Sequence, residues 1–183
     1  MAVRDKNILV SGNYFFITFT VHGWKQIFVK EKHCDLVYKW FDYMKESYGN
    51  KISVYVIMPN HIHLIIKLSG TSPLLPKLIS NGKRFLTYGI VDLLEKDGKL
   101  ELLDYFSSQA NVKKNARHKV FKERYDSLPI QSLKFFLQKL NYIHNNPCQE
   151  KWQLVAEPEL YPHSSAANYT SGRGIYDVDL VDF

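Results

Sequence analysis

The chain is poor in cysteine and has no long hydrophobic run. Its 183 residues include only Cys34 and Cys148, and no Cys-x-x-Cys pair occurs. A disulfide framework and a cysteine zinc site are therefore not indicated, and both residues are expected to be reduced thiols. No apolar stretch reaches the roughly 18 residues that a membrane-spanning helix needs, and residues 1–10 lack the apolar core of a signal peptide. We therefore expect a cytosolic protein.

Internal repeats, heptads and low-complexity segments are also missing. At this length we expect one domain over residues 1–183, with residues 151–183 as a C-terminal extension that packs on the rest. The chain is instead rich in positive charge and in aromatic residues, with a formal net charge of +6, 12 Tyr and 11 Phe. A positive charge indicates a polyanionic partner, and aromatic side chains that are not buried can stack on nucleic-acid bases.

Much of the positive charge lies between residues 113 and 124, where Glu123 is the only acid. The basic residues of this segment are Lys113, Lys114, Arg117, Lys119, Lys122 and Arg124. Such a run is either a solvated loop or a contact with the phosphate backbone of a nucleic acid. Charge alone does not choose between these two interpretations.

The pattern of apolar residues predicts the order of the secondary-structure elements. Strands are expected over residues 13–21, 52–58, 61–68 and 120–125. Helices are expected over residues 31–48, 72–94 and 130–145, and a loop over residues 97–117. Pro59 and Asn60 separate the second and third strands, which predicts an antiparallel hairpin. Gly82 and Gly89 weaken the expectation of one unbroken second helix. This order predicts an α+β fold, a ferredoxin-like antiparallel sheet with helices packed on one face.

Two histidines flank a single isoleucine at the start of the third predicted strand. Because side chains alternate along a strand, His61 and His63 point the same way, while Ile62 and Leu64 point into the core. Two imidazoles side by side on one sheet face form half of a metal site. Taken alone, such a pair is more often two partly exposed strand histidines without a role.

The end of the last predicted helix carries a second group of polar residues. Tyr142 is set off from the apolar stripe of that helix, and Asn146 follows one turn later on the same face. A hydroxyl nucleophile and an amide oxygen ligand could thus face one point. Each residue also has a simpler explanation, because a tyrosine can pack its ring at an interface and an asparagine before Pro147 can cap the helix.

Together these segments resemble a known family. Residues 58–63 resemble the His-hydrophobe-His motif of the single-tyrosine HUH transposases, the insertion-sequence transposase superfamily. Residues 142–147 resemble the catalytic-tyrosine helix in the form seen in the REP-associated tyrosine transposases. Residues 121–126 and 159–166 resemble segments of that same branch. The similar motifs cover the chain from about Tyr14 to Tyr169.

The resemblance implies a set of roles for this chain. Tyr142 would be the nucleophile, and His61 and His63 would be ligands of a divalent metal, Mg²⁺ or Mn²⁺. Asn146 stands where many insertion-sequence relatives have a glutamine as third ligand, and it is shorter by one methylene. The substrate would be single-stranded DNA with hairpin structure, cleaved and rejoined through a covalent 5′-phosphotyrosine. The insertion-sequence relatives suggest a homodimer, whereas the REP-associated branch allows a monomer.

Lys83, Arg84 and the basic residues between positions 113 and 124 are then candidates for DNA binding. A cytoplasmic protein that associates with the nucleoid through DNA is expected.

Two other functions stay open. One is a metal-dependent phosphodiesterase that uses water, although the histidine-triad pattern would need another histidine where Ile65 stands. The other is a catalytically inactive or domesticated nucleic-acid-binding protein. The presence of His61, His63 and Tyr142 counts against this second alternative.

Overall fold

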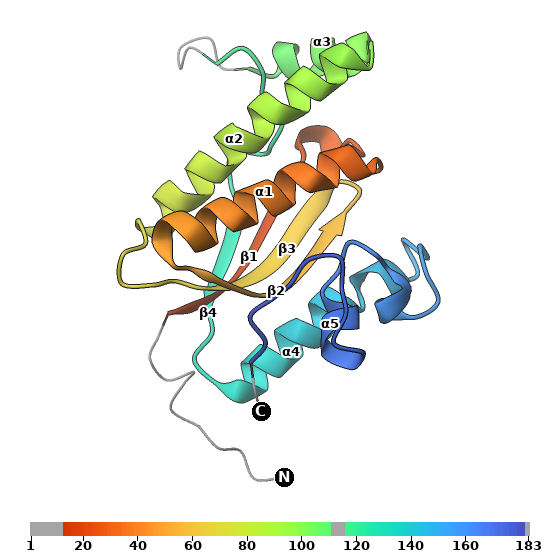
Figure 1. The fold of residues 1–183 in the computed structure, drawn as a ribbon. Helices are drawn as coiled ribbons and strands as arrows, with labels where there is room; N and C mark the ends of the chain where they lie inside the picture. Colours follow the sequence, from red (N-terminus) through yellow and green to blue (C-terminus); the bar gives the residue numbers. More distant parts are fainter. Residues whose placement is uncertain (1–12, 111–115, 182–183) are drawn as a thin grey trace.

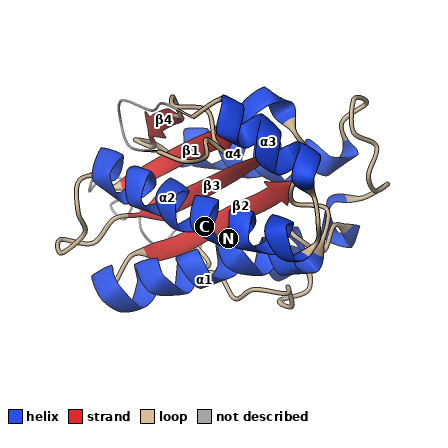
Figure 2. Ribbon diagram, turned by 90° about the horizontal axis from the view of Figure 1, so that it is seen from above, coloured by secondary structure: helices blue, strands red, loops and turns tan. Residues whose placement is uncertain are grey.

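The computed structural model describes residues 13–110 and 116–181, which build a four-stranded antiparallel sheet between helices (Figure 1). The strands are β1 (Tyr14–Thr20), β2 (Lys51–Met58), β3 (His61–Lys67) and β4 (Asp126–Pro129). Their order in the sheet is β2-β3-β1-β4, and each pair of neighbours is antiparallel (Figure 2). One α-helix, preceded by a short 3-10 turn, connects β1 to β2, and the connection from β3 to β4 is also helical. The ferredoxin-like α+β fold is therefore confirmed.

Helices α1 (Glu31–Tyr48) and α2 (Leu75–Lys96) cover one face of the sheet (Figure 1). On this face Phe19 and Leu64 of the strands join one hydrophobic cluster with Trp40 of α1 and Leu86 of α2. Helix α1 ends, as expected, at Gly49, whose φ of +66° lies in the left-handed region that glycine adopts without strain. The hydrophobic stripes of two helices and one sheet face thus form the larger core.

The other face is covered by α4 (Leu133–His144) and by the chain that follows it, including α5 (Ala166–Thr170). Phe16, Val56 and Ile65 of the strands pack there with Phe136 and Ile143 of α4. The expectation of helices on one face therefore holds for α1 and α2, whereas α4 lies on the opposite face. The reason is that β2 and β3 are buried on both sides, and a strand of this kind needs an apolar layer on each face.

Helix α2 is continuous through both of its internal glycines. A Cβ atom added at Gly82 would overlap the ring of Trp40, and one added at Gly89 would lie 2.8 Å from Leu36 Cδ2. Both contact residues belong to α1. The glycines therefore permit a close approach of α1 and α2, and the helix predicted over residues 72–94 is unbroken despite them.

Two predicted segments differ from the structure. A helix, α3 (Leu100–Ser108), occupies part of the expected loop, because Leu103 and Phe106 bury one side of it. The strand expected over residues 120–125 is also wrong, since Phe121 makes only an isolated bridge to Val21 and its side chain is buried. The fourth strand is β4, whose four residues are all exposed. Residues 111–115, with Lys113 and Lys114, lie outside the described part of the chain.

The chain after α4 runs along the edge of β2. It contains two short 3-10 helices, η3 (Asn146–Cys148) and η4 (Pro158–Leu160). The Ile57 amide donates to the His163 carbonyl at 2.8 Å, and the Ser165 amide donates to the Tyr55 carbonyl at 3.0 Å. These bonds satisfy backbone groups that an open edge strand would expose. None of the helices in the described ranges is both long and apolar enough to cross a membrane.

Candidate active site

Strand β3 places His61 and His63 on the sheet face that α4 covers. Their ring centroids lie 4.6 Å apart, and their side chains are 5% and 4% exposed. Ile62 and Leu64 point the other way and are fully buried in the core beneath α1 and α2. The orientation predicted from strand alternation is therefore confirmed.

Each nitrogen of the His63 ring lies within hydrogen-bonding distance of another side chain. Nδ1 lies 2.6 Å from the Thr18 hydroxyl, and Nε2 lies 3.3 Å from the Asn146 side-chain nitrogen. If that amide nitrogen donates, Nε2 is the acceptor, and the ring proton sits on Nδ1 and is donated to Thr18. In this tautomer Nε2 presents its lone pair toward Asn146.

His61 adopts the corresponding tautomer. Its Nδ1 lies 2.7 Å from Oδ1 of Asn60, and an amide oxygen can only accept, so the proton sits on Nδ1. The other end of the Asn60 amide donates to the Trp24 carbonyl at 3.2 Å, which fixes which end of the amide faces His61. Both histidines therefore keep Nε2 free of its proton.

Burial also keeps both rings neutral. It lowers the pKa of His61 to about 4, and the charge of Lys151 acts in the same direction. Burial lowers the pKa of His63 well below its ordinary value, with further contributions from His61, Lys151 and Lys139. The neutral imidazole is the form that binds a metal.

Helix α4 brings Tyr142 to this pair. The ring centroid of Tyr142 lies 5.2 Å from that of His63, and both rings contact Phe16, at centroid distances of 6.0 and 5.7 Å respectively. The Tyr142 side chain is 41% exposed, whereas the histidines are buried. A solvent-accessible phenol therefore stands beside a buried, neutral imidazole pair.

Asn146 begins η3, directly after α4, and it is fully buried. Its Oδ1 atom finds no hydrogen-bond partner within the described residues, and a buried oxygen in this state is costly unless a ligand satisfies it. Two donor atoms that share one Mg²⁺ or Mn²⁺ at about 2.1 Å each lie about 3 Å apart. In the structure it is the side-chain nitrogen of Asn146 that lies 3.3 Å from His63 Nε2, so Oδ1 would occupy this place beside the histidine only after a half-turn of the amide.

His61, His63 and Asn146 therefore fit a divalent cation as a set of two imidazole nitrogens and one amide oxygen. In residues 13–110 and 116–181, His, Cys, Asp and Glu side chains form no group of three that could hold a metal. A third donor beside the histidine pair would therefore be the Asn146 amide. All of these residues and Tyr142 belong to one chain.

Two lysines near the site did not emerge from the sequence. Lys139 lies one turn before Tyr142 on α4, and its Nζ is 5.5 Å from the Tyr142 ring centroid and 4.5 Å from that of Phe16. Lys151 follows η3 and contributes to the low pKa of both histidines. Lys139 could have been found from the sequence, because residues three apart, such as Lys139 and Tyr142, lie on the same face of a helix.

The DNA-binding candidates have different surroundings. The Lys83 ammonium donates to the carbonyls of residues 122, 123 and 124, at 3.0, 3.1 and 3.4 Å, and burial lowers its pKa to about 8. Lys83 therefore ties α2 to this segment. Arg84 is exposed on α2, on the sheet face opposite His61 and His63. The structure does not bring Lys83 or Arg84 to the histidine pair.

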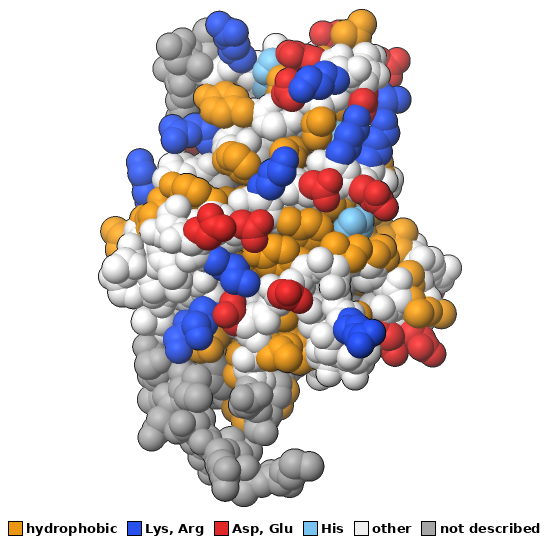
Figure 3. Space-filling view, in the orientation of Figure 1, with side chains coloured by type: hydrophobic (Ala, Val, Ile, Leu, Met, Phe, Trp, Pro, Cys, Tyr) orange, Lys and Arg blue, Asp and Glu red, His pale blue; other side chains and the backbone are white. Residues whose placement is uncertain are grey.

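The basic segment itself lies beyond α3 and before β4. Arg117 and Arg124 are exposed in it, while Lys119 and Lys122 are partly buried. On the face drawn in Figure 3, Lys and Arg side chains are interspersed with Asp and Glu and form no single basic field. That face alone does not identify a nucleic-acid surface.

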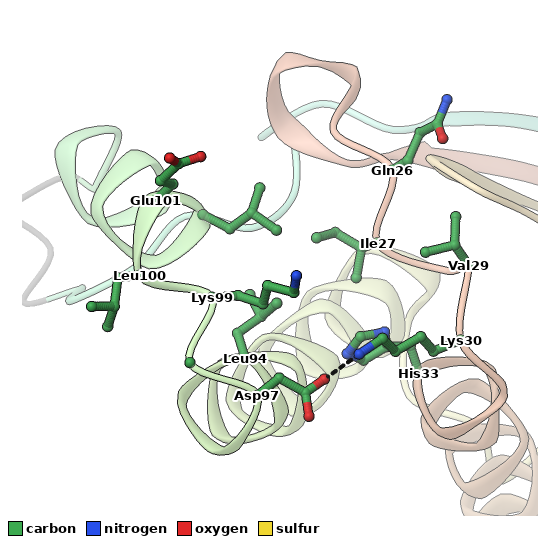
Figure 4. A pocket seen from close by; sticks show the side chains of 12 residues that line it. Gln26, Ile27, Val29, Lys30, His33, Leu94, Asp97, Lys99, Leu100 and Glu101 are labelled. Carbon is green, nitrogen blue, oxygen red and sulfur yellow. Dashed lines mark hydrogen bonds and ion pairs between the residues drawn. The ribbon is translucent and has the colours of Figure 1, made fainter.

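A cavity of about 610 Å³ lies elsewhere, between the start of α1 and the junction of α2 with α3 (Figure 4). Lys30 and Asp97 form an ion pair across it at 2.8 Å, and His33 lines its wall. None of the predicted catalytic or metal-binding residues lines this cavity. The candidate active site is thus separate from it.

Comparison with solved structures gives a match over the whole chain. A REP-associated tyrosine transposase, solved bound to a REP hairpin, superposes with a TM-score of 0.60 and 17% sequence identity. The match covers 100% of this chain and 95% of that one. The chain has the fold of a REP-associated tyrosine transposase. The resemblance seen in the motifs is therefore confirmed at the level of the fold.

A second solved chain, described as a candidate transposase from Deinococcus radiodurans R1, gives a TM-score of 0.45 and 14% identity. That match covers 78% of this chain and 97% of the other. No family model matches the sequence, and no curated protein matches it either.

Proposed function

We propose that this chain is a metal-dependent transposase that cleaves and rejoins single-stranded, hairpin-bearing DNA through Tyr142. The observation that carries the proposal is the placement of the Tyr142 ring 5.2 Å from His63, with the Asn146 amide 3.3 Å from Nε2 of the same imidazole. The three residues come from β3, α4 and η3, and the fold brings them together. A chain of the same fold was solved with a REP hairpin, which supports a DNA hairpin as the substrate.

The donor set supports a bound Mg²⁺ or Mn²⁺. His61, His63 and Asn146 would hold it through the two Nε2 atoms and the orphaned Oδ1. When bound, such a cation polarises the scissile phosphate and offsets charge on its non-bridging oxygens. The two histidines need no deprotonation before binding, because burial already keeps them neutral.

Tyr142 would carry out the covalent step. Its Oη attacks the phosphorus, the bond from phosphorus to the 3′ oxygen breaks, and the leaving oxygen takes up a proton as the phenol loses one. The products are a 5′-phosphotyrosine and a free 3′-hydroxyl. Attack of another 3′-hydroxyl on the phosphotyrosine reverses these changes and joins strands without ATP, because the energy of the broken bond is kept in the intermediate.

Lys139 would assist this step by its charge. A phenol is almost fully protonated at neutral pH, and the last turn of a helix disfavours a developing anion. The Lys139 ammonium, 5.5 Å from the Tyr142 ring centroid, opposes that effect and also attracts the substrate phosphate. Lys151 supplies a second positive charge on the histidine side of the site.

The experiment is a covalent-adduct assay with a labelled single-stranded DNA hairpin and Mn²⁺, resolved on a denaturing gel. We expect an adduct with the unaltered chain, its loss in Tyr142→Phe, and its retention in the matched control Tyr43→Phe, which changes an exposed tyrosine on α1. Cleavage that survives Tyr142→Phe would instead indicate a water-using phosphodiesterase. DNA binding without cleavage, in Mn²⁺ and equally in Mg²⁺, would indicate an inactive nucleic-acid-binding protein.

A further inference from the structure

An exposed tryptophan occupies a strained position at the end of β1. Trp24 closes the short 3-10 helix η1 (His22–Trp24) with a φ of 56°, in the left-handed region that residues other than glycine rarely adopt. Its side chain is 57% exposed. A large apolar ring in a strained backbone position and open to solvent indicates a functional constraint, because the local conformation does not favour it.

The backbone of this turn is held firmly. The His22 amide donates to the Val120 carbonyl at 2.7 Å, and the Val21 amide donates to the Asn60 carbonyl at 2.9 Å. The Asn60 side chain donates to the carbonyl of Trp24 itself at 3.2 Å. Since Oδ1 of this same Asn60 holds Nδ1 of His61, the turn is connected directly to one of the candidate metal ligands.

Basic and aromatic side chains alternate around the turn. The Lys122 ammonium lies 3.7 Å from the centroid of the Trp24 ring, and that of Lys25 lies 4.7 Å from the ring of Tyr105. The Tyr105 hydroxyl lies 3.0 Å from Nδ1 of His22. Of these two rings Trp24 is exposed and Tyr105 is half-buried. An exposed ring with neighbouring lysines is an element of surfaces that bind single-stranded nucleic acid, where bases stack and phosphates pair with ammonium groups.

We propose that Trp24 stacks against an unpaired base of single-stranded DNA, and that Lys122 and Lys25 contact the adjacent phosphates. The inference rests on the proposed function and names one part of its DNA-binding surface. Single-stranded DNA is the occupant because a duplex hides the faces of its bases from a protruding ring. Through Asn60, the stacked base is positioned relative to the histidine edge of the active site.

The test measures binding of fluorescein-labelled oligothymidylate by anisotropy, without divalent metal. Trp24→Ala is expected to weaken binding about tenfold or more, and Trp24→Phe to retain most of it, because phenylalanine still stacks. Tyr43→Ala, which removes an exposed aromatic residue on the far half of α1, is the matched control and should bind as the unaltered chain does. Binding within twofold of the unaltered chain in Trp24→Ala would overturn the stacking role, as would oligothymidylate binding too weak to measure in the unaltered chain.

A second variant separates stacking from a structural role. Trp24→Gly relieves the left-handed strain, so its melting temperature should not fall, whereas its DNA binding should fall as in Trp24→Ala. A lower melting temperature in parallel with weaker binding would indicate a structural residue. Lys122→Ala should also reduce the salt dependence of binding by about 0.7 in the slope of log K against log salt, while Trp24→Ala should leave the slope unchanged.

The binding test and the covalent-adduct assay together distinguish failure of the Trp24 proposal from failure of the proposed function. An adduct on Tyr142 together with unimpaired binding in Trp24→Ala would refute the stacking surface and leave the transposase proposal intact. Loss of binding in Trp24→Ala without any adduct in the unaltered chain would leave the surface intact and refute the cleavage chemistry.

Discussion

The Thr18 hydroxyl lies 2.6 Å from Nδ1 of His63, directly across the pairing of β1 with β3. The register of these two strands makes the residues direct partners, so a short polar side chain on one strand holds Nδ1 of the imidazole on the other. Phe16, two residues earlier on the same face of β1, stacks on the His63 ring at a centroid distance of 5.7 Å. The side chains of β1, the strand that pairs with β3, thus fix the orientation of the His63 ring.

This relationship predicts the behaviour of Thr18→Val. The substitution keeps the shape of the side chain and removes the hydroxyl that holds Nδ1, so Mn²⁺ affinity should fall about tenfold or more, as for other residues that orient a metal ligand. Isothermal titration with Mn²⁺ checks this, and Thr18→Ser, which keeps the hydroxyl, should bind as the unaltered chain does. Equal affinity in the valine and serine variants would show that the hydroxyl does not orient the ring.

Asn146 is predicted to complete the metal site. Asn146→Ala removes the orphaned oxygen and should lower Mn²⁺ affinity about tenfold or more, whereas Asn146→Asp keeps an oxygen donor of the same length and should retain binding. The same titration measures both variants, with circular dichroism as a check on folding. Unchanged affinity in Asn146→Ala would mean that the histidines bind metal without this side chain.

Stability of the metal-free protein should depend on pH through His144. Burial lowers the pKa of His144 to about 4, and its Nε2 lies 2.9 Å from the Ser165 hydroxyl. The unfolded chain, with a histidine pKa near 6.5, binds this proton more readily, so stability is complete above pH 6.5 and falls as the pH drops toward 4. The loss amounts to roughly 2 kcal/mol at pH 5 for this residue.

Urea unfolding between pH 7 and pH 5 measures the effect. The variant His144→Gln has no titrating group at this position, so its free energy of unfolding should fall less steeply over the same range. Parallel pH profiles for the variant and the unaltered chain would contradict the assignment.

The contact between α1 and α2 predicts a cost for Gly82→Ala. The added methyl group would overlap the Trp40 ring, and overpacking of this kind typically destabilises by about 1 to 3 kcal/mol. Gly70 has open space where a Cβ would stand, so Gly70→Ala is the matched control and should change stability little. If urea unfolding gives the two variants the same stability, the helices are not as close as the structure places them.

The parts of the site that follow local periodicity were predictable from the sequence. Strand alternation put His61 and His63 on one face, and the helical repeat put Tyr142 and Asn146 one turn apart. Their meeting is tertiary, and it was inferred from the resemblance to a family. The position of α4 on the opposite sheet face from α1 was not predicted. Apolar side chains occupy both faces of β2 and β3, so the sequence of these strands does not indicate which helix covers which face.

Other features escaped prediction for physical reasons. The sequence Asp-Ser-Leu-Pro of β4 has almost no strand pattern, and backbone pairing with β1 alone makes it a strand. Helix α3 is short, and only Leu103 and Phe106 mark its buried side. The role of Lys83, which donates to three backbone carbonyls, depends on a chain segment distant in sequence and could not be inferred from charge.

The most direct measurement of the central claim is the site of covalent attachment. The adduct formed with a single-stranded DNA hairpin and Mn²⁺ can be digested with nuclease and protease, and the modified peptide sequenced by mass spectrometry. A nucleotide attached through its 5′ phosphate to Tyr142 is the predicted result. Cleaved DNA with no modified peptide, or attachment to a different residue, would contradict the proposed mechanism.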